Sequence, residues 1–212
     1  QSSDGNAIIL HVGTDGDRIR IDNALGDGRI ETIRFEDGTE WTVPDMIARV
    51  ATPLDDFIYG DNGANDLSGG LGDDRMFGAL GNDTYRFAAG DGRDFIRDGS
   101  ISSADRLIIT GYAEADLRFT RLGSDSTDLA IQFVGSDDQI IISDGLRTNG
   151  RGIEEIILED EGITLTVTDV LARLVTEQSS DGNDTVIGTD GNDEIAGGPG
   201  NDLLVGQDGD DT

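Results

Sequence analysis

The chain has 212 residues and a formal net charge of −29, since 44 acidic residues stand against 15 basic ones. This charge excludes nucleic acid or an anionic membrane surface as the natural partner, and the absence of cysteine excludes a disulfide scaffold and a thiolate zinc site. No run of about 18 apolar residues is present, so we expect no membrane span. Glycine supplies 31 residues and Asp outnumbers Glu by 34 to 10. Because Gly and Asp favour turns, this composition predicts a β-rich chain with many short loops.

Residues 1–53 predict the last part of a β module. Runs of alternating apolar and polar residues, which are typical of strands, cover 7–12, 16–22 and 29–43. The segment 45–49 then predicts a short helix, with Pro44 near its start.

Two further blocks, 54–98 and 179–212, repeat every nine residues. Glycine recurs at positions one and four, Asp at position six, and an apolar residue at position eight. The apolar residues at position eight are Leu67, Met76, Tyr85, Val186, Ile195 and Leu204. Two such nonapeptides would make one turn of a flattened parallel coil, so that loops 18 residues apart become neighbours. Glycine at positions one and four would allow positive φ angles and close stacking of these loops.

These nonapeptides resemble the RTX repeat, Gly-Gly-x-Gly-x-Asp-x-apolar-x, of haemolysin-type calcium-binding proteins. The segments between the blocks resemble the β-rich module that accompanies such repeats in that family. The resemblance implies an all-β fold, in which parallel β-roll blocks alternate with β sandwich or solenoid modules that each end in one short helix. It also implies Ca²⁺ as the ligand and type I secretion, with folding outside the cell.

The spacing supports a calcium site independently of the resemblance. Carboxylates at position six and loop carbonyls would line the gap between adjacent turns, and an all-oxygen set of about six ligands suits Ca²⁺ better than Mg²⁺ or Zn²⁺. We expect five pairs to face each other across these gaps: Asp56 and Asp74, Asn65 and Asp83, Asp74 and Asp94, Asp184 and Asp202, and Asp193 and Asp211.

About two to four ions are expected in a complete roll. The residues predicted to build the calcium loops are Asp56, Gly60, Gly63, Asn65, Gly69, Gly70, Gly72, Asp74, Gly78, Gly81, Asp83, Gly90, Gly92, Asp94, Asp98, Gly182, Asp184, Gly188, Gly191, Asp193, Gly197, Gly198, Gly200, Asp202, Gly206, Gly209 and Asp211. Two departures weaken the first block, because Asn65 replaces an Asp and the repeat that holds Asp56 lacks both glycines. The alternative is that the Asp residues only cap backbone amides of glycine-rich turns.

Residues 99–178 predict a complete β module. Six short alternating runs predict strands, at 106–110, 117–122, 129–134, 139–143, 153–158 and 162–167. The segment 168–178 predicts one short helix, with Thr168 as its N-cap and an apolar stripe formed by Val170, Leu171, Leu174 and Val175.

A longer repeat relates the two halves of the chain. Residues 6–50 match 128–174, and residues 60–84 match 188–212, so a unit of about 125 residues recurs. We therefore expect the chain to be a window of a longer tandem array. The last repeat would then leave an apolar coil end exposed, which favours head-to-tail contact with an adjacent copy or a neighbouring chain.

The leading hypothesis for function is a calcium-dependent structural module of a large secreted bacterial protein, as the stalk of an adhesin, a surface layer or an extracellular filament. We expect no enzyme activity, because the single histidine, His11, aligns with Gln132 in the second copy and the carboxylates follow the nonapeptide period. The alternative is a calcium-binding accessory domain of a secreted protease, lipase or polysaccharide-modifying enzyme. A carbohydrate-binding module in 99–178 would need an exposed aromatic patch, and aromatics make up only 5% of the chain.

Overall fold

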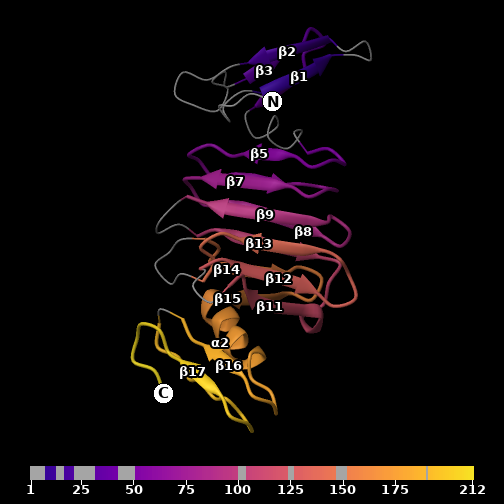
Figure 1. Cartoon of the computed structure of the whole chain (residues 1–212). Coiled ribbons are helices and arrows are strands. Elements are labelled where there is room, and N and C mark those ends of the chain that lie inside the picture. Colours follow the sequence, from indigo (N-terminus) through magenta and orange to yellow (C-terminus); the bar gives the residue numbers. More distant parts are fainter. Residues whose placement is uncertain are drawn as a thin grey trace.

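The computed structural model describes residues 8–12, 17–21, 32–42, 51–99, 104–123, 127–146, 152–189 and 191–212. Strands dominate these residues, together with one α-helix and one 3₁₀ helix. The expectation of an all-β fold is therefore confirmed. Figure 1 shows most of the strands stacked as the successive rungs of a ladder.

Two sheets form the body of the protein. The first, in spatial order, is made of β11 (Leu117–Arg121), β12 (Leu129–Phe133), β13 (Gln139–Ile142), β9 (Arg93–Asp98), β7 (Arg75–Ala79) and β5 (Phe57–Tyr59). The second is made of β15 (Ile163–Thr166), β14 (Glu155–Leu158), β10 (Arg106–Thr110), β8 (Thr84–Ala88) and β6 (Asp66–Ser68).

The nonapeptides coil because successive strands alternate between these two sheets. From β5 to β10 consecutive strands lie in opposite sheets, with β5, β7 and β9 in the first sheet and β6, β8 and β10 in the second, and neighbours within each sheet run parallel. Phe57 pairs with Arg75, and Asp66 pairs with Thr84, so one turn takes 18 residues. This is the flattened parallel coil that the spacing predicts.

The sheets continue beyond the nonapeptides without a break. β8 pairs with β10 in parallel, and β10 pairs with β14 in parallel, so the rungs of the second sheet run from residue 66 to residue 158. In the first sheet β9 pairs with β13 in parallel, and β13, β12 and β11 then form an antiparallel meander. The segments 54–98 and 99–178 therefore share both sheets.

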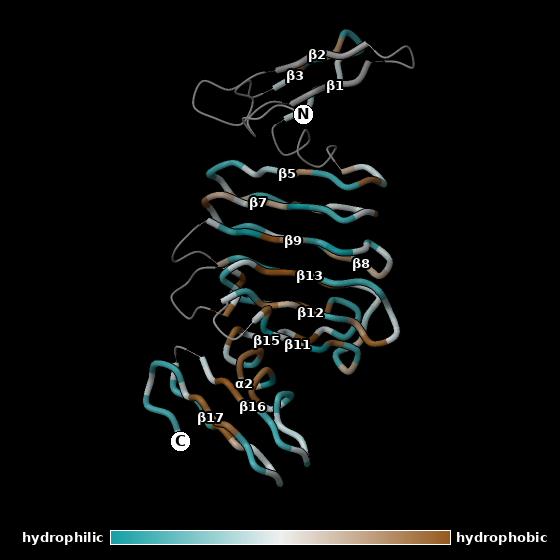
Figure 2. The backbone as a smooth tube through the Cα atoms, viewed as in Figure 1, coloured by the Kyte–Doolittle hydropathy of each residue, from teal (hydrophilic) through white to brown (hydrophobic). Residues whose placement is uncertain are grey.

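Apolar side chains fill the space between the sheets. Leu67, Met76 and Tyr85, all at position eight, are fully buried, and they belong to one cluster with Ile96 and Leu107 further along the chain. Full burial of such a side chain contributes about 1.5–3 kcal/mol relative to its exposure. Figure 2 shows the hydrophobic strands, with β13 the clearest, and the hydrophilic loops at their ends.

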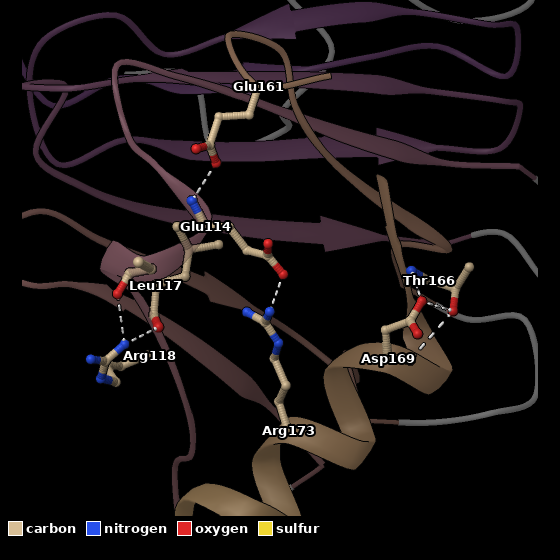
Figure 3. A network of polar contacts seen from close by, with 8 residues as sticks. Glu114, Leu117, Arg118, Glu161, Thr166, Asp169 and Arg173 are labelled. Atoms are coloured by element: carbon tan, nitrogen blue, oxygen red, sulfur yellow. Dashed lines mark hydrogen bonds and ion pairs between the residues drawn. The ribbon is translucent and has the colours of Figure 1, made fainter. Parts of the chain in front are cut away.

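The helix α2 (Val167–Glu177) closes one end of this body (Figure 1). Val170, Leu171, Leu174 and Val175 are buried, which confirms the predicted apolar stripe. The predicted N-cap is wrong: the cap is Thr166. Its hydroxyl accepts a hydrogen bond from the backbone N–H of Asp169, whose carboxylate accepts the Thr166 N–H at 2.8 Å (Figure 3). This reciprocal capping box begins the helix two residues earlier than a cap at position 168 would.

Polar contacts attach α2 to the module. Arg173 forms an ion pair with Glu114, which lies in the 3₁₀ helix η1 (Glu114–Asp116). The Glu114 N–H donates to the Glu161 carboxylate at 2.6 Å, and Arg118 donates to the Leu117 carbonyl beside it (Figure 3). None of the described helices has the length and the apolar character that a membrane-crossing helix needs.

Smaller sheets lie on either side of the body in the sequence. β1 (Ile8–Val12) pairs with β2 (Asp17–Ile21), and β3 (Thr32–Arg34) pairs with β4 (Glu40–Thr42), all antiparallel. The strands expected in this part of the first module are therefore present, whereas the helix expected at 45–49 lies outside the described residues. In the second nonapeptide block, β16 (Thr185–Ile187) pairs with β17 (Leu203–Val205) in parallel, again 18 residues apart.

Candidate metal centre

Position-six side chains form two columns along the coil. In the first column the backbone N–H of Asp56 donates to Oδ1 of Asp74 at 2.7 Å, and the N–H of Asp74 donates to Oδ1 of Asp94 at 3.1 Å. Each carboxylate thus reaches back to the loop of the preceding turn. The structure brings both pairs together as expected, including Asp74 and Asp94, which are 20 residues apart although one turn takes 18.

The second column is longer than the sequence indicated. The N–H of Asn65 donates to Oδ1 of Asp83 at 2.8 Å, and the N–H of Asp83 donates to Oδ1 of Asp105 at 2.7 Å. The N–H of Asp105 in turn donates to the Glu154 carboxylate at 2.8 Å. The column therefore continues from the nonapeptides into the following module.

Asp105 and Glu154 were missed because their spacings, 22 and 49 residues, do not follow the period of 18. A local signal for Asp105 exists. Like Asp83, Asp105 directly precedes a strand. In both cases the residues two and four positions after the Asp are apolar and buried, and for Asp105 these are Leu107 and Ile109.

The same geometry recurs in the second block. The N–H of Asp184 donates to Oδ1 of Asp202, and the N–H of Asp193 donates to Oδ1 of Asp211, both at 3.0 Å. All five expected pairs are thus neighbours in the structure.

Position-one glycines leave room for the position-six side chain of their own repeat. A Cβ atom on Gly69 would lie 2.2 Å from Oδ2 of Asp74, and one on Gly197 would lie 2.4 Å from Oδ2 of Asp202. The same close approach, to the position-six residue of the same repeat, occurs at Gly60, Gly78, Gly188 and Gly206. None of these glycines has a positive φ angle, so that part of the expectation for position one is wrong. The expected close stacking is present, since a Cβ on Gly60 would lie 2.6 Å from the Gly78 carbonyl oxygen of the next turn. Glycine is needed at position one because the position-six side chain of the same repeat occupies the space that a Cβ atom would take.

Positive φ angles occur instead at positions two and four. At position four, Gly72, Gly81, Gly200 and Gly209 have φ between 125° and 147°. A Cβ on Gly81 would also lie 2.5 Å from the carbonyl oxygen of Gly63, one turn earlier. Backbone therefore stacks directly on backbone here, with the carbonyl oxygen of one loop facing the glycine of the next turn.

The first turn of each block differs from the turns that follow. In the first turns, position two holds a polar residue that donates to the position-six side chain of its own loop. Both the N–H and the hydroxyl of Thr52 donate to Oδ2 of Asp56 at 2.7 Å, and Ser180 donates to Asp184 in the same way. Asp61 and Thr189 donate through their N–H groups to Asn65 and Asp193. Each position-six side chain of the first turns therefore has an oxygen that accepts a hydrogen bond from its own loop.

In the later turns of the first block the corresponding oxygens have no partner. Oδ2 of Asp74, Asp83 and Asp94 is buried and accepts no hydrogen bond. The three residues are 1%, 0% and 2% exposed. A buried polar atom without a partner costs about 1–3 kcal/mol, and more when it is charged. These oxygens are therefore suited to a cation.

Burial shifts the acidity of the same carboxyls. It raises the pKa of Asp83 to about 7, with further contributions from the charges of Asp98 and Asp105. It raises the pKa of Asp94 to about 8 and also raises that of Asp74, and nearby carboxylates add to both shifts. A divalent cation would reverse these shifts, because an adjacent positive charge favours the ionised carboxylate.

Not every predicted site residue lies beside a column. Gly90 has no atom within 4 Å of a Cβ position, and its N–H donates to Asp138 at 2.7 Å. A Cβ on Gly92 would lie 2.4 Å from the carbonyl oxygen of Gly72, so Gly92 belongs to the stacked backbone instead. Asp98, in contrast, does lie beside the second column: it ends β9, one of its oxygens lies within 4.8 Å of Asp83 and Asp105, and it accepts the Tyr85 hydroxyl at 2.8 Å.

The residues present fit calcium. The gap between turns offers carboxylate oxygens, and loop carbonyl oxygens such as those of Gly63 and Gly72 face the next turn; both are the hard oxygen ligands that Ca²⁺ prefers. The side chains that could hold the ion in the first block are those of Asp74, Asp83 and Asp94, which carry the unpartnered oxygens. A bound ion would supply the positive charge that these buried groups lack.

Comparison with known families agrees with this geometry. The family described as haemolysin-type calcium binding protein related domain matches residues 8–45. The family described as RTX calcium-binding nonapeptide repeat (4 copies) matches residues 50–85 and 179–212. No curated protein matches the chain. The matched ranges leave residues 86–178 outside, although the two sheets continue through them.

Proposed function

Since the chain is an RTX calcium-binding repeat protein, we propose that it is a structural module of a large secreted protein, folds outside the cell when it binds Ca²⁺, and acts there as a stalk or spacer. The stalk would belong to an adhesin, a surface layer or an extracellular filament.

The unpartnered position-six oxygens are the observation that supports this proposal. Without a cation, the buried carboxylates of Asp74, Asp83 and Asp94 must either carry uncompensated charge or take up protons. With Ca²⁺, each ion would neutralise these groups and link two turns of the coil. Because a ligand that binds only the folded chain stabilises it by mass action, calcium would drive folding where its concentration is high, as it is outside cells.

The continuity of the sheets supports a role as a spacer. The nonapeptide turns and the following module share one hydrophobic core and stack along one direction (Figure 1). A stack of this kind lengthens when further copies are added, and each copy contacts only its neighbours. The long repeat in the sequence is the arrangement that such a stalk requires.

Adjacent copies would meet at the ends of the stack. In β17, Leu203 and Leu204 are 58% and 47% exposed, so the expected apolar surface on the last repeat is present (Figure 2). In a tandem array the next turn or a neighbouring chain would cover this surface. We assign the chain no catalytic role, because its converging carboxylates belong to the stacked columns.

Circular dichroism tests the proposal directly. The chain should be unfolded or partly structured in EDTA, and it should gain β-structure on addition of millimolar Ca²⁺. An equal concentration of Mg²⁺ is the control and should fail to restore the spectrum, because Mg²⁺ prefers a smaller octahedral site that retains water. A spectrum that neither EDTA nor Ca²⁺ changes would refute calcium-dependent folding.

A further inference from the structure

We propose that Asp83, Asp98 and Asp105 form an additional Ca²⁺ site at the junction between the nonapeptides and the following module. This inference rests on the proposed calcium dependence of the chain, but it concerns residues outside the matched repeats. Asp98 and Asp105 both lie in the unmatched range 86–178, and neither is at position six of a regular nonapeptide.

The three carboxyl groups converge from three strands. Asp83 directly precedes β8, Asp98 ends β9, and Asp105 directly precedes β10. One oxygen from each lies within 4.8 Å of the others. The residues are 0%, 7% and 0% exposed, so the cluster is shielded from solvent. Each regular gap between turns offers two position-six side chains, whereas this junction offers three carboxylates.

The position of Asp83 points to a ligand. Its Oδ1 accepts the N–H of Asn65 at 2.8 Å, while its Oδ2 is buried and accepts no hydrogen bond. A Cβ atom on Gly78 would lie 2.4 Å from this Oδ2 and 2.7 Å from Oδ2 of Asp98. The unpartnered oxygen and an oxygen of Asp98 therefore lie close together beside Gly78, with the Tyr85 hydroxyl 2.2 Å from the same Cβ position, in room that any side chain at position 78 would take.

Tyr85 orients one of the carboxylates. Its hydroxyl donates to Oδ2 of Asp98 at 2.8 Å. Burial and the adjacent Asp98 charge raise the pKa of Tyr85, so the hydroxyl keeps its proton and remains a donor. A fixed hydrogen bond of this kind holds a ligating carboxylate in place, as outer-shell partners do in metal sites.

Oxygen-only ligands and the charge of the cluster select calcium. Several buried carboxylates close together cannot all ionise unless a cation is present. The cluster offers neither a thiolate nor an imidazole, so it favours a hard divalent cation over zinc or copper.

A cation here would connect the two sheets. β8 and β10 belong to one sheet and β9 belongs to the other, so an ion held by all three strands would fix the sheets together where the nonapeptides end. Folding of the module at 104–166 would thereby become dependent on calcium, although this module lies outside the matched repeats.

Calcium stoichiometry tests the assignment. Equilibrium dialysis against Ca²⁺, followed by atomic absorption, should show one ion fewer in Asp105→Asn, one fewer in Asp98→Asn, and still only one fewer in the double variant. Asp160→Asn is the matched control, because Asp160 is an exposed carboxylate of the same module that accepts a single N–H, from Gly111 at 2.7 Å. It should keep the wild-type count.

A second measurement avoids variants that fail to fold. Tb³⁺ bound at this site should be excited through Tyr85, so Tyr85→Phe should lose most of the tyrosine-sensitised Tb³⁺ emission. Tyr59→Phe, which alters a ring stacked on Phe77 at 4.9 Å, should keep it. Unchanged stoichiometry in both Asp variants, or equal emission from the two Tyr variants, would overturn the junction site and leave the repeat sites intact. A wild-type chain that binds no calcium would overturn both proposals.

Discussion

Position two of the nonapeptides allows a test with two reverse substitutions, alanine to glycine in one repeat and glycine to alanine in another, which should change stability in opposite directions. Gly70 has a φ angle of 79°, and Ala79, at the same position of the next repeat, has a φ angle of 76°. Only glycine adopts this left-handed conformation without a steric penalty. Ala79→Gly should therefore stabilise the protein, and Gly70→Ala should destabilise it.

The size of the effect follows from two opposing contributions. A left-handed alanine costs about 1–2 kcal/mol. Glycine offsets about 0.4–1 kcal/mol of this through its greater freedom in the unfolded chain. A net change of about 0.5–1 kcal/mol remains, or about 1–4 °C in Tm for a chain of this size. Gly70→Ala introduces no severe clash, because its Cβ would lie 3.5 Å from the Thr52 carbonyl oxygen, so the loss should have a similar size.

Urea unfolding in saturating Ca²⁺ is the appropriate assay. The midpoint should rise for Ala79→Gly and fall for Gly70→Ala, with an unchanged m-value. Gln207, with a φ angle of 75° in the second block, provides a replicate, and Gln207→Gly should also stabilise. The control is Ala88→Gly in β8, where glycine should destabilise a regular strand by about 0.5–1 kcal/mol. If Ala79→Gly and Ala88→Gly changed stability in the same direction, the reasoning from φ would be refuted.

Three other perturbations test the calcium columns. Without calcium, burial raises the pKa of Asp83 to about 7 and that of Asp94 to about 8, above the unfolded value of 3.8. The β-structure that remains in EDTA should therefore be greatest near pH 4 and decrease as the pH rises toward 8, and a circular dichroism spectrum in EDTA that does not change with pH would contradict this. Gly69→Ala should cost at least about 2 kcal/mol in thermal unfolding with Ca²⁺, because its Cβ would lie 2.2 Å from an oxygen of Asp74; an unchanged Tm would show that the loop adapts. Asn65→Asp should lower stability at limiting Ca²⁺ by about 1–3 kcal/mol, since the Nδ2 donor to the Asp61 carboxylate, 3.1 Å away, is replaced by a second negative charge, and saturating Ca²⁺ should recover part of this loss in calorimetry.

Regular spacing allowed the columns and the coil to be predicted from sequence. Because 18 residues make one turn, the contacts of Asp56 with Asp74 and of Asn65 with Asp83 follow from counting. Asp105 escaped this reasoning because the chain between it and Asp83 is four residues longer than one turn. A sequence pattern reveals only residues that recur at a constant spacing. A column of hydrogen bonds requires only that each new strand pairs with the sheet edge in the same register, whatever the length of the loop before it.

Local competition between acceptors explains the other differences. The helix cap is Thr166 because its hydroxyl accepts the backbone N–H of Asp169, while the Asp169 carboxylate accepts the backbone N–H of Thr166. Thr168 has no such partner three residues later. Glycine at position one, as at Gly69, reflects the nearby Asp74 oxygen and not the backbone angle. Both features depend on atoms that come together only after the coil has formed.

The polarity of the columns has a consequence for how a block folds. The first turn satisfies its own position-six acceptor, since both donors of Thr52 reach Asp56 in one block and those of Ser180 reach Asp184 in the other. These turns need no ion to compensate the acceptor, whereas the next turn leaves an oxygen of Asp74 buried without a partner. In the first block the requirement for calcium therefore begins at the second turn. A chain that forms its first turns unaided and completes the rest only with calcium would present an ordered N-terminal end of each block, to which later turns add in sequence as ions bind.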